Sequence, residues 1–167
     1  LKPVDEIELE KNVRNIAKEI SRQRNLEETS KNAKIIETKE YLLKLIQTEA
    51  ISGFKNPADA NFFDNSENSN FQAIIFSMDY YNQKNRKELE QAIFNYFSFF
   101  TKVLINQKNV IILILKTKNQ TAANNCIERA ANLFESRTFI TSGNNLIGLE
   151  GLVKSYEQAL TNKNFLF

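Results

Sequence analysis

One uninterrupted apolar run, residues 109–116, constrains the fold of this chain more than any other stretch. Its sequence is Asn-Val-Ile-Ile-Leu-Ile-Leu-Lys, which has the length of a strand and is rich in β-branched residues. A run without polar alternation predicts a strand covered on both faces, and therefore a central one. Residues 103–105, Val-Leu-Ile, lie just upstream, and the polar turn 106–109 between the two runs predicts an antiparallel hairpin.

Further apolar patterns supply neighbours for this hairpin. Residues 71–78 form a second strand-like run, and residues 138–141 form a short third one. Helical spacing predicts a helix that begins after Asn85, a helix over 121–136 and a last helix over 149–160. The first of these is expected to place Leu89, Ile93 and residues as far as Leu104 on one face, with Asn85 and Glu88 as a capping box. The order predicts an α+β domain with helices packed on a mostly antiparallel sheet.

The amino-terminal part is predicted to be helical over residues 5–51. Four apolar residues at 4, 3, 4 spacing have the pattern of a two-stranded coiled-coil seam: Leu9, Val13, Ile16 and Ile20. Residues 21–34 are polar, which fits a solvated helix or a break. A second apolar stripe follows: Ile35, Leu42, Leu45 and Ile46. Both stripes could instead pack on the globular domain. Residues 56–70 are expected to be a polar loop, pinned by Phe54, Phe62 and Phe63.

Composition excludes several classes of function. Lys and Arg total 22 against 20 Asp and Glu, so the basic excess of a nucleic-acid-binding domain is missing. The chain has no histidine, which removes the commonest general base and transition-metal ligand. Its single cysteine permits no internal disulfide and fits a reducing cytoplasm. No apolar run is long enough to span a bilayer, so no membrane association is expected.

No group of residues predicts an active site. A glycine-rich phosphate loop, paired carboxylates and metal-ligand spacing are all missing from the sequence, so no catalytic, cofactor-binding or metal-binding residue is expected. The strongest candidate for a ligand-binding face follows the first strand: Ser77, Asp79, Tyr80 and Tyr81. Cys126 falls on an apolar helical face without a basic neighbour in helical register, and we interpret it as an inert core thiol.

Residues 1–9, Leu-Lys-Pro-Val-Asp-Glu-Ile-Glu-Leu, resemble the end of a two-component receiver domain. In that family the lysine of the Lys-Pro pair contacts the phosphoryl group, the proline follows a cis bond and the last helix begins directly afterwards. The resemblance implies these roles for Lys2 and Pro3, and makes residues 1–34 the end of a receiver with a helical linker. Without the phosphorylated aspartate, Lys2 is expected to switch nothing by itself.

Residues 143–160 resemble the closing segment of the degenerate GGDEF-like domain of AraC-type response regulators. The residues that carry this resemblance are Ser155, Tyr156, Ala159 and Leu160, preceded by Leu149 and Leu152. The resemblance implies a ferredoxin-like or GGDEF-like domain over 71–167, reached through a helix and an Asn-rich loop over 35–70. Active cyclases of the related family carry glycines and acids in the hairpin turn. The turn 106–109 is Asn-Gln-Lys-Asn, and Asp79 alone cannot hold two divalent ions, so no cyclase activity is expected.

Together the two resemblances imply a non-enzymatic linker domain of a cytoplasmic response regulator that controls transcription. It would pass receiver phosphorylation to an AraC-type DNA-binding domain beyond residue 167. The implied partners are a second copy, in a weak or phosphorylation-dependent homodimer, and a sensor histidine kinase and promoter DNA through other domains. A small-molecule or nucleotide sensor, and a residual nucleotide-binding enzyme, are the alternative hypotheses.

Overall fold

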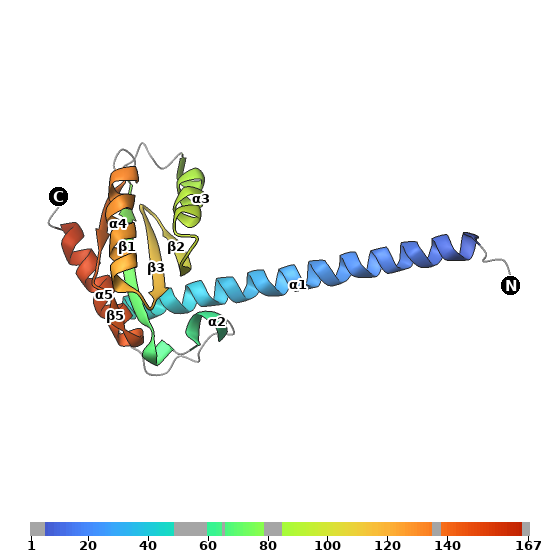
Figure 1. Cartoon of the computed structure of the whole chain (residues 1–167), viewed down its shortest axis with the longest axis horizontal. Helices are drawn as coiled ribbons and strands as arrows, with labels where there is room; N and C mark the ends of the chain where they lie inside the picture. The colour runs from blue at the N-terminus through green and yellow to red at the C-terminus, as the bar shows by residue number, and fades with distance from the viewer. Residues whose placement is uncertain (1–5, 49–59, 65, 79–84, 135–137, 165–167) are drawn as a thin grey trace.

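The computed structural model describes residues 6–48, 60–64, 66–78, 85–134 and 138–164. Within them, five strands form one antiparallel sheet and helices pack on both of its faces (Figure 1). This arrangement confirms the predicted α+β class with a long helix ahead of the sheet. The elements are, in chain order, α1 (Glu6–Thr48), α2 (Ala60–Phe63), a 3-10 turn (Ser66–Asn68), β1 (Asn70–Ser77), α3 (Arg86–Tyr96), β2 (Thr101–Gln107), β3 (Val110–Thr117), α4 (Gln120–Phe134), β4 (Phe139–Ser142), β5 (Leu146–Ile147) and α5 (Gly148–Asn164).

The apolar run at 109–116 forms β3, an interior strand of the sheet. The strand order is β2-β3-β1-β4, with β5 also paired to β1, and every residue from Ile111 to Leu115 is buried. The hairpin is confirmed, although β2 extends to Gln107 and leaves only Lys108 and Asn109 as the turn. Arg86 closes this end by donating to the carbonyl oxygens of Lys108 at 3.0 Å and Val110 at 3.3 Å.

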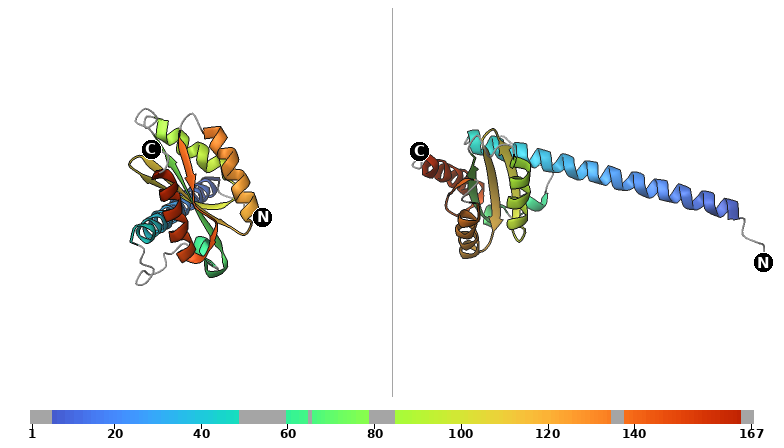
Figure 2. Two further views of the ribbon diagram at one scale, coloured as in Figure 1. Left: turned by 90° about the vertical axis from the view of Figure 1, so that its left-hand side faces the viewer. Right: turned by 90° about the horizontal axis from the view of Figure 1, so that it is seen from above.

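Strand alternation divides the core into two halves. Phe71, Ala73 and Ile75 of β1 face the end of α1, α2 and α5, whereas Ile74 and Phe76 face α3 and α4. Successive strand residues point to opposite faces, so one apolar strand serves both halves. Figure 2 shows the sheet between these two layers of helices. The burial of β1 and β3 on both faces is the physical reason why their sequences are largely apolar and do not alternate with polar residues.

The predicted helix after Asn85 is shorter than its apolar spacing indicated. It ends at Tyr96, and Leu104 belongs to β2. The chain turns tightly beyond the helix, where the Phe100 N–H donates to the Phe97 carbonyl at 3.1 Å, and the β-prone residues that follow pair with β3. The capping box is also wrong, because Asn85 makes no side-chain cap bond.

The polar stretch 56–70, expected from its composition to be a loop, contains local structure in its described part. Residues 60–63 form α2, residues 66–68 form a 3-10 turn, and Asn70 already belongs to β1. Phe62 and Phe63 are buried and confirm the predicted anchors, with the Phe63 ring 5.2 Å from that of Tyr41. Burial of two adjacent aromatic rings explains how so polar a stretch is ordered. Phe54 lies outside the described residues.

α1 is one continuous helix through the polar region 21–34. Its last turns dock on the sheet through Tyr41, Leu42, Leu45 and Ile46, all buried. Ile35 does not join them: it is 47% exposed, because α1 meets the domain only from Thr38 onward. The second apolar stripe therefore packs on the globular domain, with Ile35 as the exception.

Candidate functional site

The first apolar stripe of α1 lies on a part of the helix that packs against no other described element. Every residue from 8 to 37 is exposed, and this segment, about 45 Å long at 1.5 Å per residue, extends away from the sheet (Figure 1). The four predicted seam residues, Leu9, Val13, Ile16 and Ile20, are between 45% and 60% exposed. The alternative that they pack on the globular domain is therefore wrong. Apolar side chains lined up on an exposed face indicate an interaction surface.

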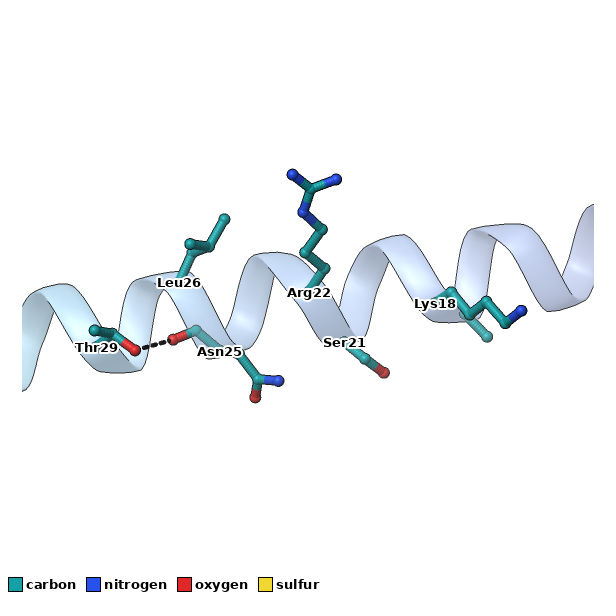
Figure 3. Close-up of a pocket in the computed structure, with 7 residues that line it drawn as sticks. Lys18, Ser21, Arg22, Asn25, Leu26 and Thr29 are labelled. Carbon is teal, nitrogen blue, oxygen red and sulfur yellow. Dashed lines mark hydrogen bonds between the residues drawn. The ribbon is translucent and has the colours of Figure 1, made fainter.

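The seam occupies a narrow arc of the helix. At 100° per residue its four side chains fall within about 60° of one another, while Asn25 points about 150° away. A shallow hollow lies on that far side, lined by one face of α1 alone: Ala17, Lys18, Ser21, Arg22, Asn25, Leu26 and Thr29. Figure 3 shows these side chains radiating from a single helix, so the hollow is a strip of helix surface and not an enclosed site.

The described residues contain no group of three or more Asp, Glu, Cys or His that could hold a metal ion. Lys108 and Asn109 form the hairpin turn between β2 and β3. The guanidinium of Arg86 donates hydrogen bonds to the backbone carbonyl oxygens of Lys108 and Val110. Glu90 lies close by, and its carboxylate is paired with Arg86 at 3.1 Å. Among the described residues, this turn presents the cationic Lys108 and no unpaired carboxylates.

The candidate ligand face after β1 receives no support from its one described member. Ser77 is 5% exposed, and its buried hydroxyl has no hydrogen-bond partner among the described residues. Asp79, Tyr80 and Tyr81 lie outside the described residues, as do Lys2 and Pro3 at the amino terminus. Only Ser77 of this candidate face can therefore be placed, and the face stays a prediction.

The residues of the closing segment serve the core. Ser155 and Ala159 are fully buried, Tyr156 is 8% exposed, and Leu160 packs at the edge of the same cluster. The Ser155 hydroxyl accepts a hydrogen bond from the backbone N–H of Ala73 at 3.0 Å. Burial raises the pKa of the Tyr156 phenol, so it stays neutral through the physiological range. These side chains attach α5 to the sheet.

Cys126 is half-buried, and its environment corrects one expectation. Burial raises the pKa of the thiol, whereas a hydrogen bond with the Tyr96 side chain and the charge of Arg129, one helical turn away, lower it, so a basic neighbour is present after all. Burial is the larger influence and leaves the pKa of Cys126 above its ordinary value. A neutral thiol is a poor nucleophile and a poor metal ligand, which agrees with a structural role.

One concave region was not predicted from the sequence. It lies where α1 leaves the domain, has a volume of about 320 Å³, and takes its walls from α1, α2, α3 and β2. Its members are Ile35, Thr38, Lys39, Phe62, Phe94 and residues 101–104. Four separate segments contribute to it, so no local sequence pattern could have indicated it.

Comparisons of this chain with profiles of known protein families, with curated proteins and with solved structures find no match. Among the described residues, no helix has both the length and the apolar character that crossing a bilayer requires. Function must therefore be inferred from the geometry of the chain, whose most prominent feature is the exposed seam of α1.

Proposed function

We propose that this chain is a non-enzymatic relay domain of a two-component response regulator that controls transcription. In this proposal α1 pairs with α1 of a second copy and couples an upstream receiver to a downstream AraC-type DNA-binding domain. The observation that carries the proposal is the apolar seam on the projecting half of α1, whose other half is fixed to the sheet through Leu42 and Leu45. The resemblances of residues 1–9 and 143–160 supply the class of protein.

The charges beside the seam favour a parallel pair in register. In heptad terms Val13 and Ile20 take a positions, and Leu9 and Ile16 take d positions. Glu19 then occupies a g position, which faces the e position five residues further along the partner helix. That residue is Arg24, of opposite charge, and the symmetric pair forms twice in the dimer. An antiparallel pair would instead set Glu10 against alanine and Glu19 against asparagine, without this attraction.

The seam is short, and its continuation opposes pairing. The next core positions hold Gln23, Glu27, Ser30 and Lys34, so Glu27 and Lys34 would each meet their own copy. The apolar part spans only about 17 Å of helix, too little for a stable isolated coiled coil. A weak association is what a switch needs, because receiver contacts worth a few kcal/mol can then move most of the population into the dimer.

The decisive test uses the natural polypeptide that contains this chain, treated with a small-molecule phosphodonor such as phosphoramidate. The proposal predicts incorporation of an acid-stable, base-labile phosphoryl group and a shift from monomer to dimer in light scattering. A Val13→Glu variant should incorporate the same phosphate and remain monomeric. A polypeptide that takes up no phosphate, or whose dimer is indifferent to Val13→Glu, would contradict the proposal.

A further inference from the structure

The concave region at the exit of α1 lies along the free edge of the sheet. β2 is the terminal strand of the order β2-β3-β1-β4, and Thr101, Lys102, Val103 and Leu104 form one wall of the hollow. Phe62 of α2 comes from one face of the sheet, and Phe94 of α3 from the other. The hollow thus curves around the edge of β2, with Ile35 and Thr38 of α1 opposite. Its volume of about 320 Å³ falls at the lower end of the range for small-molecule sites.

Large apolar side chains in this wall remain open to solvent. Ile35 is 47% exposed and Phe94 is 48% exposed, although both lie in a concavity that could bury them. A ligand removes more apolar surface from water in a concave site than on a convex surface, because the walls of the site contact it from several sides, and the binding free energy is correspondingly more favourable. The walls therefore favour an aromatic or aliphatic body.

The charged groups that line the hollow, Lys39 and Lys102, are cationic. The ammonium of Lys102 lies 4.1 Å from the centroid of the Phe94 ring, and burial lowers the pKa of this lysine. Lys39 lines the same hollow and its continuation toward α3, where Lys87 joins it. Glu90 is the acid in that continuation, and it is already paired with Arg86. The excess of positive charge favours an anionic group.

We propose that this hollow binds a small amphipathic organic anion, with its apolar body between Ile35, Phe62 and Phe94 and its carboxylate or sulfonate at Lys102 and Lys39. An added peptide strand is the less favoured occupant of this edge. Thr38 and Lys39 of α1 share the hollow with residues 101–104 of β2, and Lys39 also lines its continuation with Leu104 and Asn106, so α1 obstructs an extended peptide along this strand. The inference does not rest on the proposed relay function.

Such a ligand would touch both the helix and the domain at the point where they separate. Ile35 lines the hollow from the exposed part of α1, whereas Phe94 and Lys102 line it from the globular domain. Binding would therefore restrain the first turn of α1 outside the domain. A ligand in the hollow could therefore regulate the contacts that the exposed part of α1 makes with a partner.

The test uses 2-naphthoate as the probe and its neutral amide, 2-naphthamide, as the matched ligand. The chain contains no tryptophan, so naphthalene fluorescence can be followed without indole emission. The proposal predicts saturable binding of the naphthoate, about tenfold weaker binding of the amide, and a similar loss in Lys102→Gln, as expected when a charge-assisted contact is removed. Phe94→Ala, which truncates a half-exposed side chain, should also abolish binding without unfolding the chain.

Lys154→Gln is the matched control, because Lys154 is exposed on α5 and does not line the hollow. It should bind the naphthoate like the parent, and bound naphthoate should slow amide hydrogen exchange over residues 35–39. Equal binding of naphthoate and amide, an equal effect of Lys154→Gln, or no saturable binding would each overturn the proposal. Tighter binding of a strand-forming peptide than of naphthoate would overturn it in favour of strand addition.

Discussion

The hydroxyl of Ser155 accepts a hydrogen bond from the backbone N–H of Ala73 at 3.0 Å, in the gap between β4 and β5 on the side of β1 opposite β3. β4 pairs with β1 from Ile74 onward, and β5 pairs with it only as far as Phe71. Between them, the N–H of Gly143 donates to the carbonyl of Ala73 at 3.0 Å. A helix side chain therefore completes the edge of the sheet and ties α5 to its central strand.

Replacing Ser155 by alanine leaves the N–H of Ala73 buried without a partner. An unsatisfied buried donor costs about 1–3 kcal/mol, so the free energy of unfolding of Ser155→Ala should fall by that amount in urea denaturation. Thr161→Ala, an exposed position on the same helix, is the control and should change little. Equal stability of the two variants would mean that the Ser155 contact contributes nothing.

Gly143 has no room for a side chain. A Cβ atom there would lie 1.8 Å from the backbone oxygen of Ser155, so Gly143→Ala must push α5 away from the sheet edge. We expect a loss of about 3 kcal/mol, at the upper end of overpacking effects. Gly148 is the matched control: its φ is +77° and the space around its Cα is open, so alanine there meets only backbone strain of about 1–2 kcal/mol. Thermal melts that rank the two variants in the opposite order would contradict this account.

Tyr156 is predicted to be a structural residue. It is 8% exposed and packs in the same cluster as Leu152 and Val153. Truncation in Tyr156→Ala should lower the free energy of unfolding by about 3 kcal/mol or more, through lost burial and the cavity left behind. The measurement is urea denaturation followed by circular dichroism. A variant as stable as the parent would show that α5 does not depend on this ring.

Cys126 should react slowly with thiol reagents in the folded protein. Burial raises its pKa, so at pH 8 less of it is thiolate in the folded state than in the unfolded state. The pKa of Cys126 is higher in the folded state than in the unfolded state. The contribution of the neutral thiol to the free energy of unfolding is therefore complete below the unfolded-state pKa and is lost as pH rises through the folded-state pKa. Reaction with a chromogenic disulfide should accelerate in urea. An equal rate of reaction in the folded state and in urea would contradict the conclusion that burial protects the Cys126 thiol.

The sequence predicted those elements whose residues are specified locally. The β3 run and the buried half of α1 follow from apolar periodicity, and the turn of the hairpin follows from its polar residues. Two predictions failed because tertiary structure overrides that periodicity. Leu104 has helical spacing with Leu89 but pairs with β3 as part of β2. Ile35 has the spacing of the second stripe but stays exposed, because α1 is buried against the domain only from Thr38 onward. β5, only Leu146–Ile147, is too short to carry a pattern of its own.

The exposed seam also illustrates what periodicity leaves open. Spacing alone could not tell whether Leu9, Val13, Ile16 and Ile20 face the domain or solvent, because both require one apolar face. The continuity of α1 through residues 21–34 decides this point by carrying the seam away from the sheet. The hollow at the α1 exit could not be predicted either, since it depends on where α1 crosses β2.

The seam can be tested with a charge placed on it and the same charge placed beside it. Val13→Glu with Ile16→Glu puts acids where two helices would meet, whereas Leu26→Glu changes a residue that is 61% exposed and off the seam. All three positions lie outside the globular core, so each variant should melt like the parent. Loss of the fold in the double variant would mean instead that this part of α1 supports the core.

Sedimentation velocity of this chain over a concentration series, from low micromolar upward, tests the central claim most directly. We predict a weak monomer–dimer equilibrium for the parent and for Leu26→Glu, and a monomer at every concentration for the Val13→Glu, Ile16→Glu double variant. A parent that never associates, or a dimer that survives both seam substitutions, would contradict pairing through α1.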